Sequence, residues 1–519
     1  MQTNILEYLE QTVRICPDKP AFIREQESLT FRQVFDQARA IGSRLHKAGL
    51  EKQPVAVLMD KHPRTIAAFL GVIFGGCYYI PLDREMPRVR LEMILQTAQP
   101  GILICDETTR PLAESIKQSA RVCLYADLAF GAIDEAALAR IREQQLDIDP
   151  IYIVFTSGST GVPKGVTGCH RAVIDYIEQL CPVLGFNSST CFGNQTPLYF
   201  DACLKEILPT LKFGASMHLI PRQLFLFPLR LMEYLNTHRI NTICWVASAL
   251  SMVSSLHTFE KIVPTCLKTV AFASEPLPAR QLACWRAALP GARFLNLYGP
   301  TEATGICCYY EVNRDFAEDE AIPIGRPFPN TQILLLDETN QSPAPGEPGE
   351  ICVRGTRLTL GYYRDSARTA AAFVQNPLNP LYPDIIYRTG DLGKYNDRGE
   401  LVFLGRKDCQ IKHMGHRIEL GEIEAAACMH PEVRGACCLY DSAHGKLLLY
   451  YAGTPSPAKL LDYLRQKLPR YMLPHSVCQL DAIPMTPNGK TDRNLLLQRS
   501  NCHGSPACDS VRASPGCGL

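Results

Sequence analysis

The sequence lacks long apolar runs, a charge excess of one sign and paired cysteines, and each absence excludes a class of protein. Its 53 Lys and Arg residues nearly balance its 52 Asp and Glu residues, which leaves a net charge of +1. Nucleic-acid and anionic-membrane surfaces need a one-signed patch, so we expect neither partner. No apolar run approaches the roughly 20 residues of a membrane span, and the polar N-terminus has no signal-peptide pattern. We therefore expect a cytoplasmic protein.

The cysteines are numerous, 22 in all, but they lack the spacing of a metal site or a disulfide framework. No C-x-x-C pair occurs, and the adjacent pairs Cys307-Cys308 and Cys437-Cys438 suit neither a zinc site nor an ordinary disulfide. We expect reduced thiols, most of them buried as small hydrophobic side chains.

The chain has 519 residues and 46% hydrophobic content, enough for several domains. Short β-rich runs such as Ile151–Phe155 alternate with helical patterns such as Thr65–Phe74, which predicts an α/β architecture. Closely spaced strands with Gly and Pro between them predict a small β subdomain at about 328–407. Residues 408–499 have an α+β pattern, and the aperiodic segment 500–519 is expected to be a disordered tail.

One loop concentrates glycine, hydroxyl groups and a lysine: Thr156-Ser-Gly-Ser-Thr-Gly-Val-Pro-Lys-Gly165. Glycines let backbone N–H groups approach an anion closely, the hydroxyls add donors, and Lys164 adds positive charge. The Walker spacing G-x-x-x-x-G-K-[ST] is absent. We interpret the loop as a polyphosphate site, with a mobile surface loop as the alternative. The candidate ligands of the phosphates are Thr156, Ser157, Gly158, Ser159, Thr160, Gly161 and Lys164.

This loop resembles the signature of the adenylate-forming superfamily, which includes acyl-CoA synthetases, luciferases and the adenylation domains of nonribosomal peptide synthetases. Further motifs match in the same order: Phe74–Asp83, Asn296–Glu302, Tyr387–Leu392, Gly405–Asp408, Arg417–Glu424, Leu468–Pro474 and Asn488–Arg493. Stand-alone amino-acid adenylation domains, including D-alanine–carrier protein ligases, are the most similar type. The resemblance implies an adenylation core of two α/β subdomains and a β subdomain over 1–407, a small mobile lid domain over 408–499, and ATP and Mg²⁺ as cofactors.

The resemblance also implies roles for single residues of the core. Tyr298 would stack on adenine, Asn296 would contact the adenine edge, and Asp391 would bind the ribose hydroxyls. Thr301 would contact the α-phosphate and Glu302 would bind magnesium, which prefers hard oxygen donors. The remaining expected nucleotide contacts are Gly299 and Arg406.

In the C-terminal domain, Lys490 is implied to be the catalytic lysine that bridges the substrate carboxylate and the ATP phosphates. Asp408 resembles the hinge about which this domain rotates between adenylate formation and acyl transfer to a thiol. The string Lys412–Gly415 departs from the usual hinge sequence, which leaves the role of Lys412 open.

Asp201 stands where amino-acid-activating relatives place a carboxylate against the substrate ammonium, whereas aryl- and fatty-acid relatives lack it. Capping of the following helix is the alternative role. Motif register places the following residues around the substrate with Asp201: Ala202, Lys205, Trp245, Ala271, Ala273, Leu297, Gly305, Ile306 and Lys490. Trp245 and Leu297 would narrow this pocket. An inward Lys205 would favour an acidic amino acid, and an outward Lys205 would favour a small one such as alanine.

No phosphopantetheine attachment motif follows Arg493, so we expect a stand-alone ligase that loads an amino acid onto a separate phosphopantetheinylated carrier protein. We also expect a monomer. Two alternatives remain open: an acyl- or aryl-CoA synthetase, and a non-catalytic nucleotide-binding paralogue. Amino-acid-dependent ATP–pyrophosphate exchange separates the three.

Overall fold

The computed structural model describes residues 2–158, 161–407, 410–442, 444–485, 491, 493 and 495–497. The chain divides into two compact units. The first consists of Met1–Arg84, Thr97–Val154 and Gly165–Lys407, and the second of Glu85–Gln96, Phe155–Lys164 and Asp408–Leu519. Within the described ranges, no helix is both long enough and apolar enough to cross a membrane. The expected tail at 500–519 lies outside the described residues.

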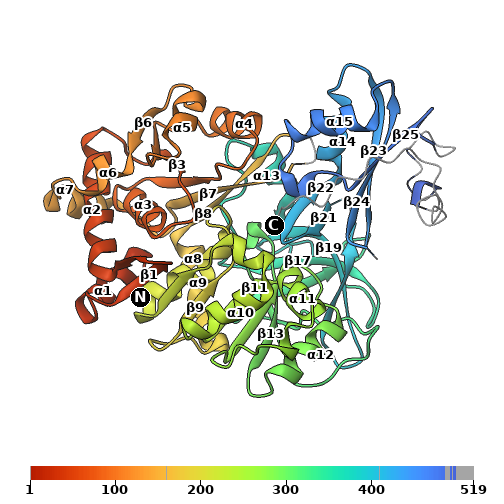
Figure 1. Ribbon diagram of the computed structural model, residues 1–519, viewed down its shortest axis with the longest axis horizontal. Helices are drawn as coiled ribbons and strands as arrows, with labels where there is room; N and C mark the ends of the chain where they lie inside the picture. Colours follow the sequence, from red (N-terminus) through yellow and green to blue (C-terminus); the bar gives the residue numbers. More distant parts are fainter. Residues whose placement is uncertain are drawn as a thin grey trace. The chain divides into compact units, whose positions relative to one another are not determined.

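The first unit contains a nine-stranded sheet in the order β15-β14-β13-β12-β11-β9-β10-β1-β2 (Figure 1). Pairing is parallel from β13 through β1, and both edges of the sheet are antiparallel. The strands are β1 (Pro20–Arg24), β2 (Glu27–Thr30), β9 (Cys191–Asn194), β10 (Ser216–Leu219), β11 (Thr242–Val246), β12 (Thr269–Ala273), β13 (Arg293–Tyr298), β14 (Cys308–Glu311) and β15 (Arg326–Pro327).

A six-stranded sheet has the order β6-β5-β3-β4-β7-β8. Its strands are β3 (Pro54–Leu58), β4 (Tyr78–Leu82), β5 (Ile102–Cys105), β6 (Arg121–Leu124), β7 (Pro150–Thr156) and β8 (Lys164–Cys169). All residues of β3, β4 and β5 are buried, as expected for parallel strands covered on both faces. The candidate phosphate loop begins at the end of β7 and leads into β8.

Helices alternate with these strands along the chain, as the α/β pattern predicts. They are α1 (Leu6–Ile15), α2 (Phe31–Lys47), α3 (Pro63–Phe74), α4 (Arg88–Ala98), α5 (Arg110–Ile116), α6 (Tyr125–Ala129), α7 (Glu135–Gln144), α8 (His170–Leu184), α9 (Leu204–Phe213), α10 (Pro228–Thr237), α11 (Ala247–Ser255) and α12 (Ala279–Ala288). The helix expected at Thr65–Phe74 begins two residues earlier because Pro63 occupies its first turn and the His62 side chain caps it.

Two hydrophobic clusters lie on opposite faces of the nine-stranded sheet. One contains Ala271 and Ala273 of β12 together with residues of α8 and α9. The other contains Val270 and Phe272 of the same strand together with residues of α11 and α12, which lie beside β11 and β13 in Figure 1. This alternation follows from the period of two in a strand, and it decides which side chains can face the same ligand.

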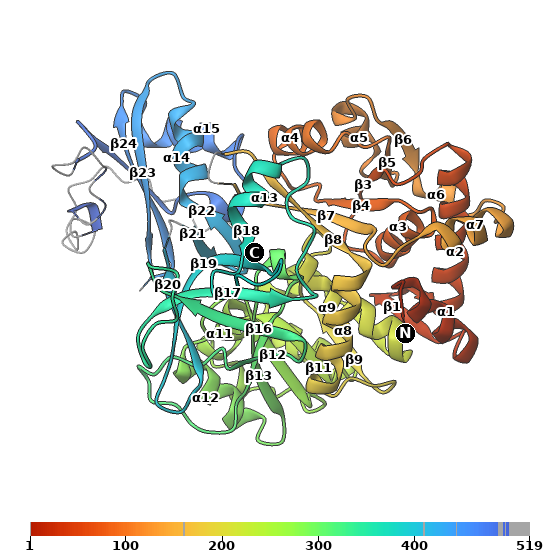
Figure 2. The same ribbon diagram turned by 180° about the vertical axis from the view of Figure 1, so that it is seen from behind.

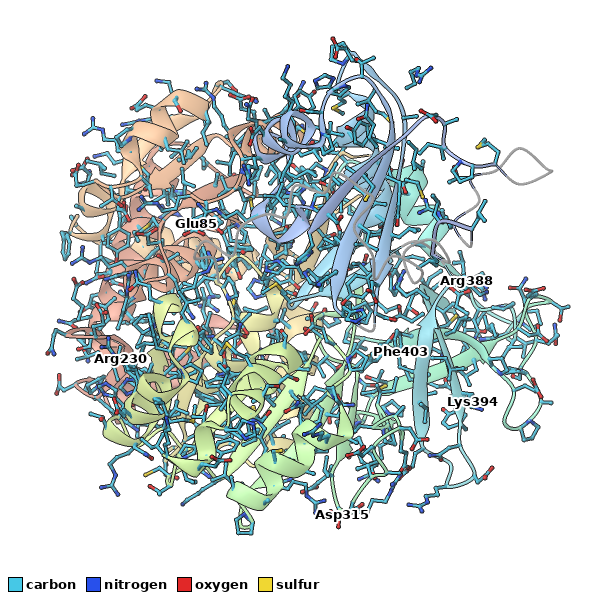
Figure 3. All side chains as sticks on the ribbon, turned by 45° about the vertical axis from the view of Figure 1, so that its right-hand side comes forward. Glu85, Arg230, Asp315, Arg388, Lys394 and Phe403 are labelled. Carbon is cyan, nitrogen blue, oxygen red and sulfur yellow. The ribbon has the colours of Figure 1, made fainter. Side chains whose placement is uncertain are left out.

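An antiparallel five-stranded sheet is formed by residues between Thr331 and Arg406. Its strands are β16 (Thr331–Leu336), β17 (Gly349–Gly355), β18 (Phe373–Gln375), β19 (Ile385–Tyr395) and β20 (Leu401–Arg406), and α13 (Ser366–Ala372) precedes β18. Arg388 and Lys394 mark the course of β19 and Phe403 that of β20 in Figure 3.

The second unit contains a hairpin of β21 (Gln410–His413) and β22 (His416–Glu419), which Figure 2 labels. A three-stranded sheet in the order β23-β24-β25 follows it in the chain. The other elements are α14 (Leu420–Cys428), β23 (Val433–Asp441), β24 (Lys446–Gly453), α15 (Pro457–Arg465) and β25 (Ser476–Leu480). Residues of α14 and α15 form one hydrophobic cluster with the sheet, and a second, smaller cluster includes Leu496.

Each cysteine that the structure describes is free, and most are buried. This agrees with the expectation of reduced thiols.

Candidate functional site

Asp201 lies in a 3₁₀ turn, Asp201–Cys203, immediately before α9. Its Oδ1 accepts a hydrogen bond from Thr301 Oγ1 at 3.2 Å, and its buried Oδ2 has no hydrogen-bond partner among the described residues. Neither the turn nor α9 has a side-chain N-cap, so helix capping does not explain this carboxylate. Burial raises the pKa of the Asp201 carboxyl to about 6, despite the opposing Thr301 hydrogen bond.

The unpartnered oxygen of Asp201 lies beside Gly305, where the backbone is left-handed with φ +83°. A Cβ atom at this glycine would lie 3.7 Å from Asp201 Oδ2 and 3.6 Å from the Tyr176 hydroxyl. That hydroxyl is also buried and without a partner in the described part of the chain. A buried acceptor and a buried hydroxyl therefore border the same position, which is the arrangement that a polar ligand such as an ammonium group can satisfy.

Most of the other residues predicted to contact the substrate lie on the same side of the nine-stranded sheet as Asp201. Ala273 of β12 pairs with Leu297 of β13, and both belong to the cluster that also contains Tyr176 and Ile306. The Ala273 and Leu297 side chains are apolar, so they would pack against the substrate and would not hydrogen-bond to it. Sequence analysis missed Tyr176 because it lies on α8, far from every motif.

Trp245 is an exception, and its predicted place in the pocket is corrected. In the sheet register Trp245 is aligned with Phe272, and it belongs to the cluster on the opposite face. Its Nε1 donates to the Gly193 carbonyl at 2.7 Å, and its ring packs 5.1 Å from that of Phe225. Its neighbour Cys244 is the residue of β11 that joins the Asp201 side. Because successive side chains of a strand point to opposite faces of the sheet, Trp245 and Cys244 cannot both face the substrate, and the sequence alone could have shown that one of them must face away.

Lys205 is directed into the protein, with 3% of its surface exposed. Its Nζ donates to the Ala202 carbonyl at 2.8 Å and to Thr196 Oγ1 at 3.1 Å. The structure therefore agrees with the inward alternative and not with a side chain that reaches solvent. Thr196, which orients this ammonium, carried no signal in the sequence.

Other charged groups lie close to Lys205. The Glu206 carboxylate is fully buried and accepts a hydrogen bond from the Asn194 amide. Lys61 Nζ donates to the carbonyls of Asn194 at 2.9 Å and Gln195 at 3.0 Å. Desolvation lowers the pKa of Lys61 to about 7, and the Glu206 charge opposes that shift. Lys61, Asp201, Lys205 and Glu206 form a charged cluster whose members influence one another's pKa without direct ion pairs between them.

The residues expected to bind the nucleoside also lie together in the first unit. Tyr298 donates its hydroxyl to Asp391 Oδ2 at 2.5 Å. Arg406 forms an ion pair with Asp391 and donates to the Thr389 carbonyl at 3.0 Å. The Tyr298 ring lies 6.3 Å from that of Phe403, which is labelled in Figure 3. Tyr298, Asp391 and Arg406 therefore form one connected group.

Asn296 lies on β13 with Tyr298, and Gly299 directly follows the strand. A Cβ atom at Gly299 would overlap the Gly305 carbonyl, so the close approach of the two backbone segments requires glycine. Asn296 aligns with Phe272, which places it on the sheet face opposite Asp201. Its Nδ2 donates to the Pro323 carbonyl at 2.9 Å.

Thr301 and Glu302 lie in a 3₁₀ turn, Thr301–Ala303, that Thr304 ends with a left-handed φ of 54°. Glu302 is fully buried, and its Oε1 accepts the Tyr362 hydroxyl at 2.8 Å. Among the described residues, no group of three or more His, Cys, Asp or Glu side chains could hold a metal ion. A single carboxylate fits magnesium, which normally completes its shell with phosphate and water.

The candidate phosphate loop belongs to the second unit. Ser157 donates its hydroxyl to the Arg417 carbonyl at 2.7 Å, and the Gly161 N–H donates to the Gly158 carbonyl at 2.9 Å. Thr156 Oγ1 is buried without a partner in the described ranges, and Lys164 is buried. The predicted site residues outside the described ranges are Ser159, Thr160, Asp408 and Lys490.

Two family models match this chain, one in its N-terminal part and one in its C-terminal part. Residues 9–363 match the family model for AMP-binding enzymes, and residues 422–490 match the model for the AMP-binding enzyme C-terminal domain. The chain is 32% identical over 499 residues to tyrocidine synthase 1 of Brevibacillus parabrevis, covering 95% of this chain but 45% of that protein. It is 31% identical over 505 residues to an L-proline–L-prolyl-carrier protein ligase of Streptomyces coelicolor, covering 92% and 93% of the two chains.

Two solved structures are similar over nearly the whole chain. PA1221, a nonribosomal peptide synthetase protein with adenylation and PCP domains bound to a vinylsulfonamide inhibitor, has a TM-score of 0.82 and 27% identity, covering 96% of this chain and 84% of its own. The adenylation domain AlmE of Vibrio cholerae, in complex with glycyl-adenosine-5'-phosphate, has a TM-score of 0.82 at 22% identity, covering 97% and 98%; this likeness concerns the fold alone.

Proposed function

Because the chain belongs to the family of AMP-binding enzymes, we propose that it activates an amino acid as an aminoacyl-adenylate and transfers it to a separate carrier protein. The observation that carries the proposal is the buried, unpartnered Oδ2 of Asp201. An unpaired buried carboxylate costs several kcal/mol, and the α-ammonium of an amino acid would remove that cost. The acceptor would be the phosphopantetheine thiol of the carrier.

In the proposed reaction, the substrate carboxylate attacks the α-phosphate of ATP and pyrophosphate leaves. Thr301 is suited to orient the substrate, because its hydroxyl already fixes Asp201 at 3.2 Å. Tyr298 and Asp391 would hold the nucleoside, and Lys490 would stabilise the negative charge that develops between carboxylate and phosphate. A magnesium ion bound by Glu302 would neutralise part of the negative charge of the ATP phosphates.

The charged cluster favours an acidic amino acid over a small neutral one. The charges of Asp201 and Glu206 oppose that of Lys205. A substrate ammonium at Asp201 would add a positive charge, so Lys205 would lose part of its counter-charge. Lys205 has two protein acceptors for its three N–H donors. A side-chain carboxylate on the substrate would supply both the third acceptor and the missing charge.

The test of the function is ATP–pyrophosphate exchange measured with each proteinogenic amino acid and with matched acids that lack the amino group. Strong exchange with an amino acid supports the proposal. Exchange only with acids that lack the amino group would identify an acyl- or aryl-CoA synthetase. Nucleotide binding without any exchange would identify a non-catalytic paralogue.

Lys205→Leu is expected to change the substrate preference. Removing one partner of a buried charge pair costs about 2–5 kcal/mol, so kcat/KM for glutamate or aspartate should fall by about 10²-fold, whereas kcat/KM for alanine should not fall. Exchange rates across the amino acids measure both values.

Lys212→Leu is the matched control, since Lys212 lies on the same helix but pairs with Glu178 at 2.6 Å, away from the charged cluster. It should leave the preference unchanged. An unchanged preferred substrate in Lys205→Leu would refute the acidic-substrate proposal.

The KM for the amino acid is expected to depend on pH near the pKa of Asp201. The free carboxyl has a pKa of about 6, and only its ionised form pairs with an ammonium group. The competent fraction therefore falls as the pH drops below this value, and the KM should rise about tenfold from about pH 7 to about pH 5. Exchange measured at saturating ATP gives this profile, and Asp201→Asn, which lacks the titrating group, should not show it.

A further inference from the structure

Arg357 lies two residues after β17 and is fully buried. Its Nη1 donates to the Ile306 carbonyl at 2.5 Å, and its own backbone carbonyl accepts the Thr304 hydroxyl at 2.6 Å. One residue therefore contacts the chain on both sides of Gly305, the position that Asp201 Oδ2 borders.

The backbone of the 304–306 segment depends on such contacts. Thr304 and Gly305 are both left-handed, with φ of 54° and 83°. Glycine adopts this conformation without strain, whereas the β-branched threonine does not. A strained residue keeps such a conformation only when surrounding contacts hold it. Arg357 supplies two of these contacts, and so it helps to fix the backbone beside Asp201.

Asp175 of α8 orients the Arg357 guanidinium. Its Oδ2 lies 3.5 Å from Arg357 Nη2, and its Oδ1 accepts the Asn330 amide at 2.6 Å. The guanidinium carbon also lies 5.3 Å from the centroid of the Phe328 ring. A carboxylate, itself fixed by an amide, and an aromatic ring thus direct the guanidinium toward the Ile306 carbonyl.

The buried pair of Arg357 and Asp175 is a weak source of stability, because desolvation of two charges offsets their attraction. In addition, Arg357 Nε and Nη2 make no hydrogen bond within the described ranges, so the guanidinium gains less than a fully bonded one. Stability is therefore a poor reason for an arginine at this place. The contact with the Ile306 carbonyl gives the arginine a role at the substrate.

We propose that Arg357 is a positioning residue for amino-acid binding, which acts by holding the 304–306 segment beside Asp201. The inference rests on the proposed function, because it assigns Arg357 an effect on the affinity for an amino acid. The backbone of Gly305 borders the unpartnered oxygen of Asp201, so a shift of this segment changes the space in which the substrate ammonium meets that oxygen.

Glu302, the expected magnesium ligand, is held by contacts that do not involve the Arg357 side chain. The Thr359 N–H donates to the Glu302 carbonyl at 3.0 Å, and the Tyr362 hydroxyl donates to Glu302 Oε1 at 2.8 Å. A substitution of the Arg357 side chain leaves both contacts in place. We therefore expect the KM for the amino acid to change more than kcat or the KM for ATP.

Arg357→Met is expected to raise the KM for the preferred amino acid by about tenfold, which is the loss typical of one hydrogen bond to a charged group. In ATP–pyrophosphate exchange, kcat and the KM for ATP should change less than about threefold. Arg357→Lys keeps one charged donor and should recover part of the affinity. A parental KM for the amino acid in Arg357→Met, or an equal rise in the KM for ATP, would overturn the proposal.

A double variant separates positioning from the loss of a counter-charge. Arg357→Met leaves Asp175 buried without its partner, which should lower the melting temperature. Asp175→Asn/Arg357→Met removes both charges, and the asparagine oxygen can still accept the Asn330 amide. The melting temperature should therefore recover in the double variant, whereas the KM for the amino acid should stay raised. A return of that KM to the parental value would assign the effect to the unpaired carboxylate and overturn the positioning role.

Arg354→Met is the matched control. Arg354 lies on β17, three residues before Arg357, and its Nε donates to Asp384 Oδ1 at 2.6 Å from a side chain that is 35% exposed. Its substitution also removes a guanidinium from an ion pair, but it should leave the KM for the amino acid unchanged. The proposed function fails on a different result, namely the absence of amino-acid-dependent exchange in the parental protein. The positioning role fails alone when the parental protein is active and Arg357→Met has the parental KM.

Discussion

Lys490→Ala is expected to lower amino-acid-dependent ATP–pyrophosphate exchange by about 10²- to 10³-fold, which is the loss typical of removing one group that stabilises developing charge. Attack of a carboxylate on a phosphate brings two negative groups together, and no uncharged side chain can replace an ammonium there. The loss should appear in kcat. We expect the substitution to leave folding intact, because an Asn-Gly-Lys sequence is of the type that occurs at solvated turns.

Lys467→Ala is the control for this prediction. Lys467 belongs to the same unit and lies 5.6 Å from the Tyr463 ring centroid, so its loss also removes one positive charge. Its exchange rate should equal that of the parent. Equal rates in Lys490→Ala and the parent would remove Lys490 from the mechanism.

Asp201→Asn is expected to raise the KM for the preferred amino acid by about 10²- to 10³-fold, because the substrate ammonium would lose the charge that pairs with it in a buried site. The carboxylate has one oxygen held by Thr301 and one without a partner, so the asparagine can keep the first contact. The rise in KM would therefore measure the contribution of Asp201 Oδ2, the oxygen that has no partner among the described residues. Exchange as a function of amino-acid concentration measures the effect.

An acid that lacks the amino group provides the internal control for Asp201. Its ability to support exchange should not worsen in Asp201→Asn, since it has no ammonium to lose a partner. Asp315→Asn, at a side chain that is 97% exposed, should behave as the parent with either substrate. If Asp201→Asn raised the KM of both acids equally, Asp201 would have a structural role and the amino-acid assignment would fail.

Motif order predicted most of the connected groups around the site, because each motif brings its own local geometry. The group of Tyr298, Asp391 and Arg406 illustrates this, since its members come from three motifs and are joined by a hydrogen bond and an ion pair in the first unit. The strand at Ile151–Phe155 was also predictable, and the structure extends it by one residue at each end. A continuous apolar run between turn signals is sufficient for such a prediction.

Side-chain direction was less predictable. Motif register placed Trp245 beside the substrate, but a strand position one residue out of phase faces the other side of the sheet, and Trp245 packs there against Phe225. The direction of Lys205 could not be decided from sequence either. It depends on Thr196 and on a carbonyl of the preceding turn, and such acceptors are defined only once the chain has folded.

The charged cluster has a consequence for the redesign of specificity. Asp201, Lys205 and Glu206 are buried and influence one another's charge, so replacing one of them leaves a buried charge with less opposing charge nearby. A neutral substitution that suits a new substrate would also destabilise the protein unless a second position changed with it. A single substitution such as Lys205→Leu should therefore change the substrate preference at a cost in stability, and a second substitution that restores the charge balance should recover that stability.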